Sequence, residues 1–262
     1  MPAETRPTVV ALVPVWNGAA FLREALDSIL AQEPPVDEIV VIDDGSTDGS
    51  GDIARSYGPR VHVVRQENGG LASARNAAVR ESRADVIAFL DSDDVWPRGR
   101  LAVLLQALGA NPDCGIVQGR LQRMVRSGGM DEWQLVDESW LAPNVATALI
   151  RRSAFAAVGP FDGKVAGGDD VDWLLRARDH GIREARVESI TLHYRRHDAN
   201  MTNDVAKDQS RLLHVLGRAV ARRRAAAAQT AATAQAVGTA DAATAPTPPE
   251  ATTTAAELDD PA

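Results

Sequence analysis

The sequence predicts an α/β fold with a mostly parallel sheet and helices on both of its faces. Two observations predict this fold. Short β-branched runs alternate with amphipathic helical segments through the first half of the chain, and polar turns follow three of these runs, at Asn17, Asp43–Asp44 and Asp91–Asp94. Strands that alternate with helices form parallel βαβ units. Open sheets of this kind bind ligands at the carboxyl ends of their strands, where we expect the three turns to meet.

The expected elements follow one another regularly over the first 110 residues. A buried strand at 8–13 leads into a helix at about 19–32, whose apolar side chains recur at helical spacing. A short helix reaching about Tyr57 begins near Asp48 or Ser50, either of which is a good N-cap residue. The other elements expected in this half are strands at 38–42, 61–65 and 86–90 and helices at about 70–82 and 97–110.

The second half of the chain is less regular. Residues 121–140 show no clear period, whereas 144–158 are typical of a strand that leads into a helix. Two further helices are expected at 170–180 and at 205 to about 224. After Arg224 the composition turns to Ala, Thr, Pro and acidic residues, which bury too little surface to fold. The sequence therefore predicts one domain at 1–224 and a disordered Ala/Thr/Pro-rich tail at 225–262.

Composition excludes several classes of function. The chain has 262 residues and a net charge of −8, which argues against binding to nucleic acid. Its single cysteine, Cys114, forms no internal disulfide, and no apolar run approaches the ~20 residues of a membrane span. Residues 1–10 do not form a secretory signal. We expect a cytoplasmic enzyme or binding protein. The basic run 218–224 leaves peripheral membrane contact open, although a solvated charge run is the favoured interpretation.

The acidic turns are the chemically informative part of the chain. Asp91, Asp93 and Asp94 place three carboxylates within four residues, and these repel one another unless a cation lies among them. Mg²⁺ and Mn²⁺ prefer such oxygen ligands and complete their shell with substrate phosphates and water. Taken alone, the turn is equally well explained as a solvated helix cap. The sequence contains no dinucleotide, Walker, zinc-site or GxSxG serine motif in the required context.

A series of blocks in consistent order resembles the family 2 glycosyltransferases. The likeness covers about residues 8–202 and implies a GT-A fold that transfers a sugar from a nucleotide donor with inversion at the anomeric carbon. The blocks are VPVWNG at 13–18, VIDDGSTD at 41–48, NGGLASARN at 68–76, FLDSDD at 89–94, RSAF and VGPFD within 152–162, GDDVDW at 168–173 and YRRH at 194–197.

The resemblance implies roles for residues in the nucleotide half of the site. Pro14 and Trp16 would line the base pocket, Asp44 would hold the base or the ribose, and Arg75 would lie near the uridine and phosphates. A UDP-linked donor is the favoured choice.

The resemblance also implies a metal site and a catalytic base. The Asp-x-Asp region would bind the sugar nucleotide through Asp91, Ser92 and Asp93, and Mn²⁺ or Mg²⁺ would be held by Asp93, Asp94 and His197, with His193 as the alternative histidine. Asp170 matches the family's general base, and such a base contributes ~10²–10⁴-fold to the rate. The chain departs from the family pattern at Asp169, where the family often has Glu. His180 is an alternative base, although its place at a helix end favours a surface role.

The leading hypothesis is a non-processive enzyme that moves one sugar per event. No Gln-x-x-Arg-Trp follows Asp172–Trp173, and no spans for polymer export are present in the sequence. The acceptor is left open among a glycan, a lipid-linked sugar, a peptide and a small molecule, with Trp133 and Trp140 as a sugar platform or as packing residues. Two alternatives are a non-catalytic sugar-nucleotide-binding module and a metal-dependent nucleotidyltransferase. Asp170 counts against the first, and the missing basic glycine-rich loop counts against the second.

Overall fold

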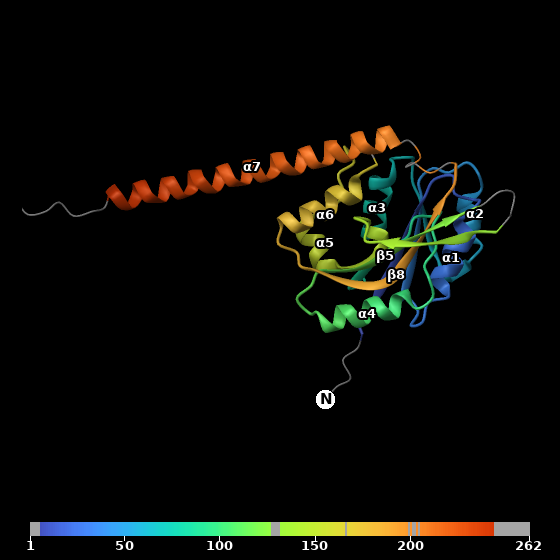
Figure 1. Cartoon of the computed structure of the whole chain (residues 1–262). Helices are drawn as coiled ribbons and strands as arrows, with labels where there is room; N and C mark the ends of the chain where they lie inside the picture. Colours follow the sequence, from blue (N-terminus) through green and yellow to red (C-terminus); the bar gives the residue numbers. More distant parts are fainter. Residues whose placement is uncertain are drawn as a thin grey trace, which may run out of the picture. The chain divides into compact units, whose positions relative to one another are not determined.

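The computed structural model describes residues 6–126, 132–165, 167–198, 200, 203 and 205–243 (Figure 1). The chain divides into two compact units, Met1–Ala219 and Val220–Ala262. The first unit contains the strands and all helices except the second part of the last one.

Four parallel strands form the nucleus of the sheet, as the sequence predicts. They are arranged in the order β3-β2-β1-β4, so the chain steps outwards from β1 in both directions. Every residue of β1 is buried, which explains why its sequence is an unbroken apolar run. The bounds are β1 (Val9–Val15), β2 (Glu38–Asp43), β3 (His62–Arg65) and β4 (Val86–Phe89).

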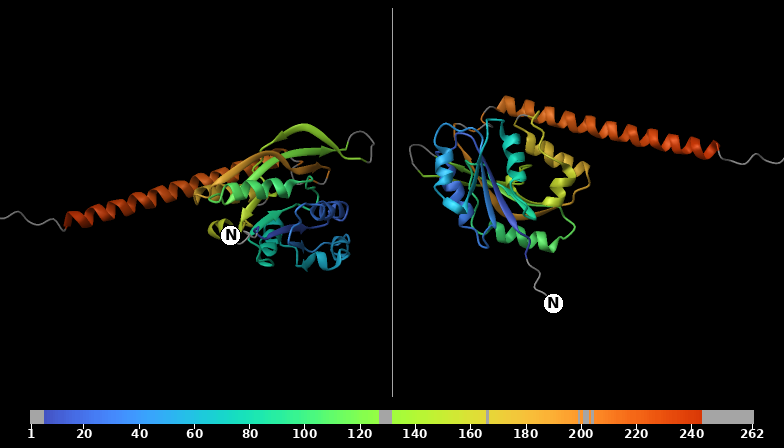
Figure 2. Two further views of the ribbon diagram at one scale, coloured as in Figure 1. Left: turned by 90° about the horizontal axis from the view of Figure 1, so that it is seen from below. Right: turned by 180° about the vertical axis from the view of Figure 1, so that it is seen from behind.

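Helices cover both faces of this sheet (Figure 2). Alternate residues of β1 point to opposite faces. Val9, Ala11 and Val13 pack in the cluster with α1, α2 and α4, whereas Val10 and Leu12 pack in the cluster with α3, α5 and α6. The helices are α1 (Leu22–Leu30), α2 (Ser50–Arg55), α3 (Leu71–Arg80), α4 (Arg100–Ala110), α5 (Arg152–Val158) and α6 (Asp169–Asp179), with short 3₁₀ turns η1 (Gly58–Arg60) and η2 (Val145–Thr147).

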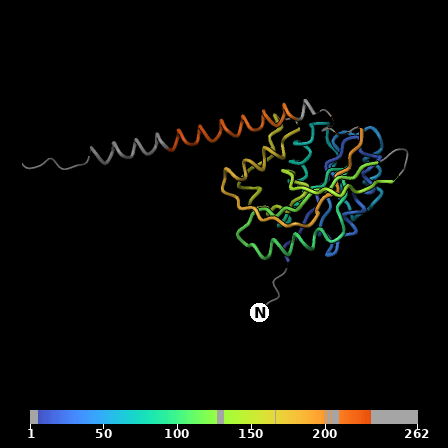
Figure 3. Tube along the Cα trace, viewed as in Figure 1, coloured from blue at the N-terminus to red at the C-terminus, as the bar shows by residue number. Residues whose placement is uncertain are grey.

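The second half extends the sheet with strands of mixed direction. β7 pairs antiparallel with β4 and with β5, β6 pairs antiparallel with β5, and β8 runs parallel to β5. The trace in Figure 3 shows β8 returning alongside β5 after α6. Over the described residues, the sheet has eight strands, of which these four are β5 (Ile116–Val125), β6 (Gln134–Trp140), β7 (Ala148–Arg151) and β8 (Glu184–Arg196).

The sequence analysis assigns no strand to β5 or β6. The pairing of β5 shows register shifts with two of its three partners, at Gln122/Met124 against β6 and between Gln118 and Leu121 against β8. A bulge inserts an unpaired residue and breaks the two-residue alternation of a strand. The periodicity that identifies a strand is therefore lost here, although the strands themselves are long.

The last helix, α7 (Val205–Ala243), continues past Arg224, where the sequence analysis ends it. The expected boundary is therefore wrong, because residues 225–243 are rich in alanine, the strongest helix former, and contain no proline. The disorder predicted for 244–262 lies outside the described residues. In the first unit, α7 buries Val215 and Ala219, and Arg218 pairs with Asp162. None of the described helices is long and apolar enough to cross a membrane.

Candidate active site

The loops that follow β1 and β2 are joined by hydrogen bonds. Ser46 Oγ accepts from the Asn17 backbone N–H (3.0 Å), and Asn17 Oδ1 accepts from the Thr47 N–H (2.8 Å). Asn17 has a positive φ of 52°, a conformation that asparagine tolerates better than most residues. A Cβ on Gly18 would lie 2.8 Å from Ser92 Oγ, so this loop also packs closely on the Asp91–Asp94 turn. The three polar turns therefore meet at one edge of the sheet, as expected.

Asp44 organises the neighbouring loop at 66–70. Its carboxylate accepts hydrogen bonds from Gln66 Nε2 (2.6 Å) and from the backbone N–H groups of Gly69 and Gly70 (2.9 Å each). The side chain is buried, so these bonds are made away from water. Gly70 has a φ of 84°, which suits a glycine at the residue before α3. The predicted contact of Asp44 with a nucleotide base or ribose stays a prediction.

The two residues predicted to line a base pocket differ in exposure. Pro14 is buried within β1, whereas Trp16, just beyond the strand, is 60% exposed. An exposed indole beside a polar loop offers a flat face on which a planar base can stack.

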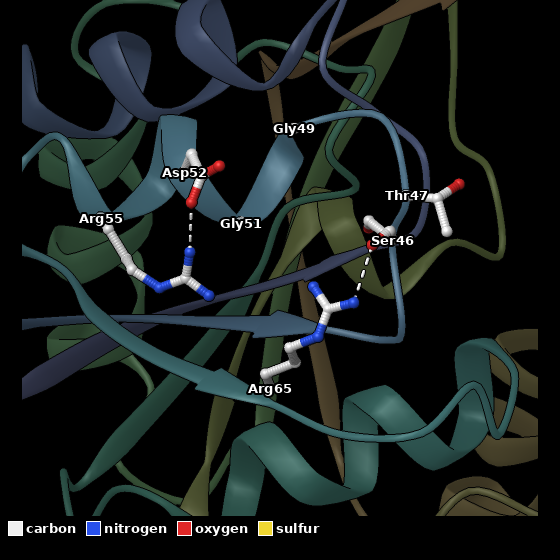
Figure 4. Close-up of a pocket in the computed structure, with 7 residues that line it drawn as sticks. All are labelled: Ser46, Thr47, Gly49, Gly51, Asp52, Arg55 and Arg65. Atoms are coloured by element: carbon white, nitrogen blue, oxygen red, sulfur yellow. Dashed lines mark hydrogen bonds and ion pairs between the residues drawn. The ribbon is translucent and has the colours of Figure 1, made fainter.

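A separate small cavity lies beside the loop that follows β2, and none of the predicted site residues lines it (Figure 4). There Arg65 donates to the buried Asp43 (2.6 Å) and to the Ser46 carbonyl (2.9 Å). The cavity is lined by Ser46, Thr47, Gly49, Gly51, Asp52, Arg55 and Arg65. Asp43 therefore supports the loop from within.

Arg75 connects two of the predicted acidic motifs. Its guanidinium donates from Nη2 to Asp91 Oδ1 and from Nη1 to Asp169 Oδ2, at 2.8 Å each. Arg75 and Asp169 are nearly fully buried, while the Asp91 side chain keeps 25% of its surface exposed. Buried charges are stable only when paired in this way. A single cation thus fixes the end of β4 to the start of α6, and its Nε remains without a partner.

Asp170 lies beside this bridge at the start of α6. The pKa of Asp170 is raised to about 6, mainly by burial; the Arg75 cation lowers the pKa, and the nearby carboxylates of Asp169 and Asp91 raise it. Its Oδ1 accepts a hydrogen bond from the Val171 N–H (2.8 Å). These interactions place Asp170 in the same electrostatic environment as Asp91. A carboxyl group with a pKa near 6 is suited to accept a proton at neutral pH.

The other end of the acidic turn meets the end of β8. His197 Nε2 lies 3.2 Å from Asp93 Oδ2, and the His197 ring stacks on Phe21 at 4.4 Å between centroids. Burial and the Asp91 charge raise the pKa of Asp93. His193, the alternative histidine, instead forms backbone hydrogen bonds with Val95. The structure thus brings the His197 side chain to Asp93 of the predicted metal-binding turn, whereas His193 pairs through its backbone with the residue that follows this turn.

Asp94 faces the interior of the protein. It is 0% exposed, and its Oδ1 accepts from the Arg195 backbone N–H (2.9 Å) while Oδ2 has no partner. Burial is the main cause of its strongly raised pKa, and Asp93 and Asp91 add to it. This burial favours a structural role for Asp94 over the metal-ligand role that the sequence analysis gives it.

The donor set at the turn fits a divalent cation only in part. Within the described ranges, no group of three His, Cys, Asp or Glu side chains converges to hold a metal ion. Asp93 and His197 nevertheless supply one oxygen and one nitrogen donor side by side. Mg²⁺ and Mn²⁺ sites with one or two protein ligands take their remaining ligands from substrate phosphates. The residues present are therefore compatible with a cation that arrives with a diphosphate.

Sequence reasoning missed a group of residues that holds this turn in place. Arg195 is fully buried, donates to Glu24, and lies 5.6 Å from the Phe21 ring and 5.5 Å from the Trp133 ring. Asn200 donates to the Arg195 carbonyl (3.0 Å) and accepts from the His197 N–H. These contacts join α1 to β8 across the sequence. In the sequence, the only signal for this group of residues is the position of Arg195 within the YRRH block at 194–197.

Comparisons with known proteins agree with this architecture. The model of the Glycosyl transferase family 2 matches residues 10–159. Relatives include the putative teichuronic acid biosynthesis glycosyltransferase TuaG of Bacillus subtilis, 38% identical over 38% of this chain and 42% of its own length. The glycosyltransferase AglE of Haloferax volcanii is 28% identical over 68% of this chain and 63% of its own length. The chain spans only 28% of the length of RP339 of Rickettsia prowazekii, which is 42% identical over the matched part.

Solved structures share the fold. The mannosyltransferase PcManGT of Pyrobaculum calidifontis, in complex with GDP-Man and Mn²⁺, superposes with a TM-score of 0.67 at 24% identity, covering 83% of this chain and 65% of that one. TarS of S. aureus, in complex with UDP-GlcNAc, superposes with a TM-score of 0.61 at 18% identity, covering 75% of this chain and 61% of that one. The predicted GT-A type of α/β fold is confirmed. Because the family model matches more than half of the residues of this chain, the chain belongs to glycosyl transferase family 2.

Proposed function

We propose that the protein is a non-processive, inverting glycosyltransferase that moves one sugar from a nucleotide-sugar donor to an acceptor hydroxyl. Family membership supports the reaction class. The donor class is supported by the fold relatives, since TarS binds UDP-GlcNAc and PcManGT binds GDP-Man. A UDP-linked donor is our first choice, and the acceptor is a glycan, a lipid-linked sugar, a peptide or a small molecule.

Asp170 acts as the general base in this proposal. Its pKa of about 6 leaves the carboxylate ionised at pH 7 and basic enough to take the proton of an attacking hydroxyl. The Arg75 bridge holds α6 against the end of β4, which fixes the base relative to Asp91. In-line attack from the side of the base displaces the nucleoside diphosphate and inverts the anomeric carbon.

The leaving diphosphate is received at the turn that carries Asp91, Ser92 and Asp93. Asp93 and His197 would hold Mn²⁺ or Mg²⁺, which supplies charge neutralisation for the diphosphate when bound. Arg195 and Asn200 keep the His197 backbone in place, and Asp94 anchors the same turn from the interior. The exposed face of Trp16 offers a stacking surface for the base.

The observation that carries the proposal is the Arg75 bridge, which joins the acidic turn to the helix of the predicted base. We expect Asp170→Asn to reduce transfer by about 10²- to 10⁴-fold, because the variant cannot accept the proton. Donor affinity, measured by calorimetry with Mn²⁺, is expected to stay within a few-fold, because the nucleotide half of the site is unchanged.

Asp113→Asn is the matched control, because Asp113 forms an ion pair with Arg183 at the surface and its side chain is 71% exposed. This variant is expected to keep full activity. If Asp170→Asn turned over donor at the wild-type rate, residue 170 would not be the base. If the wild-type protein bound donor and transferred nothing to any acceptor class, the alternative of a non-catalytic binding module would replace the proposal.

A further inference from the structure

Side chains of α3 and α6 hold the VGPFD block at 158–162, which runs from the last residue of α5 into the following loop. Each backbone carbonyl from 158 to 161 accepts a hydrogen bond from one of them. Arg176 Nη1 (2.9 Å) and Nη2 (2.8 Å) and Trp173 Nε1 (2.8 Å) donate from α6. Asn76 Nδ2 donates from α3 to the Phe161 carbonyl (2.9 Å). Because successive carbonyls are paired with the protein and not with water, the loop is fixed between the two helices.

Asn76 bonds to both backbone polar groups of Phe161. Its Nδ2 donates to the carbonyl and its Oδ1 accepts from the N–H, at 2.9 Å each. A side-chain amide offers one acceptor oxygen and one donor nitrogen, and here both act on a single residue. Asparagine is a weaker helix former than alanine, so helix propensity does not explain its place within the alanine-rich helix α3. The contact with Phe161 does explain it.

The ring of Phe161 lies against the Arg75 guanidinium. The guanidinium carbon is 5.6 Å from the centre of this ring and 6.0 Å from the centre of the Phe89 ring. The two rings contact each other edge to face, with 5.5 Å between their centroids. Phe161 is 3% exposed and Phe89 is fully buried, so the cation meets both rings away from water, where such contacts are strongest. Arg75 is therefore held by aromatic contacts as well as by its ion pairs.

We propose that Asn76 is a positioning residue, which fixes the Phe161 ring against Arg75 and so keeps the guanidinium between Asp91 and Asp169. Without the Asn76 amide, the loop keeps its bonds to α6 but loses the two bonds at residue 161, and the ring is no longer fixed against the cation. Any effect on transfer rests on the proposed function, in which the Arg75 bridge fixes the base. The positioning itself is measurable without transfer.

Hydrogen exchange of the Arg75 Nε–H, followed by NMR in the full chain without donor, tests the proposal. The signal is identified by its loss in Arg75→Lys. This nitrogen is buried and has no hydrogen-bond partner, so its proton exchanges with water only when the site opens. The backbone amides of β1, in which every residue is buried, report the opening of the whole domain. In Asn76→Ala, the Arg75 exchange rate is expected to rise about tenfold more than the β1 rates.

Ser82→Ala is the matched control. Ser82 is also buried, and its Oγ accepts from the Ala84 N–H (3.0 Å) in the turn that follows the same helix. This variant is expected to change the Arg75 and β1 exchange rates by the same factor and to leave kcat unchanged. If Asn76→Ala also changed both rates by the same factor, Asn76 would only add stability and the proposal would be overturned. An unchanged Arg75 exchange rate in Asn76→Ala would overturn it as well.

Phe161→Leu tests the same contact from the other side, because it removes the ring and leaves the backbone bonds to Asn76 in place. It is expected to accelerate Arg75 exchange as much as Asn76→Ala does. The double variant is expected to add no more than about twofold, because both changes remove one contact. Fully additive effects would overturn the proposal, since Asn76 would then act by another route.

Turnover separates this proposal from the proposed function. Displacement of a positioned group slows catalysis, so kcat is expected to fall about tenfold in Asn76→Ala and in Phe161→Leu. Faster Arg75 exchange with an unchanged kcat would support the positioning by Asn76 and would contradict the role of the Arg75 bridge in transfer.

Discussion

Replacing Asp170 by Asn is expected to stabilise the folded protein at neutral pH while it removes activity. Burial raises the pKa of Asp170 from 3.8 to about 6, a difference of about two pH units. Each unit corresponds to about 1.36 kcal/mol, so ionising this group in the folded state costs up to about 3 kcal/mol. The side chain keeps some exposure to solvent, which reduces the expected gain for the neutral amide to about 1–3 kcal/mol.

The sign of the pH dependence follows from the raised pKa. Between pH 4 and 6 the folded protein binds a proton at Asp170 that the unfolded chain has lost, so this group's contribution to the unfolding free energy falls as pH rises. The unfolding free energy of the variant is therefore expected to exceed that of the wild type by almost nothing at pH 4 and by the full difference above pH 7. Urea unfolding of both proteins at pH 4.5, 6 and 7.5 measures the difference. A constant difference, or a variant less stable than wild type at pH 7.5, would refute the assignment of a desolvated carboxyl at this position.

Three further predictions concern the same site. Transfer by the wild-type enzyme is expected to fall about tenfold per pH unit below pH 6, because protonated Asp170 cannot act as a base, and a rate profile that is flat from pH 5 to 8 would contradict this. Arg75→Gln leaves two carboxylates without their shared cation and is expected to cost about 3–5 kcal/mol of unfolding free energy, measured by urea unfolding; a loss below 1 kcal/mol would show that the bridge is not structural. Excess chelator is expected to stop transfer, and added Mn²⁺ is expected to restore it. The His197→Ala variant is expected to need about tenfold more Mn²⁺ for its half-maximal rate. An unchanged Mn²⁺ requirement in this variant would show that His197 is not part of the metal site.

The first half of the fold could be predicted from the sequence because its elements are locally consistent. β1 is buried on both faces and its sequence is an uninterrupted apolar run, and α1 repeats apolar residues at helical spacing. The meeting of the three polar turns followed from topology alone, since parallel strands end at the same edge. These are features in which short-range pattern and long-range packing agree.

The rest of the fold and of the candidate site depends on contacts between segments that are distant in the sequence. Arg75 bridges two carboxylates that lie 16 and 94 residues away, and Arg195 reaches Glu24 across 171 residues. Nothing in the local pattern of a single sequence indicates such pairs. The burial of Asp94 was hidden for the same reason, because the adjacent Asp93 is the same residue type in the sequence and yet keeps 29% of its side chain exposed. The missed strand β5 shows a related difficulty, since its bulges erase the alternation that would identify it.

The shared guanidinium of Arg75 also constrains how this protein can be redesigned. A chimera that replaces the second half of the chain would bring a new side chain at position 169, while the first half would keep an arginine positioned for the short aspartate side chain. Lengthening that residue to glutamate would change the geometry of its ion pair with Arg75, so the two residues depend on each other. The modules on either side of the bridge are therefore best exchanged together, with residues 75, 91 and 169 transplanted as one set.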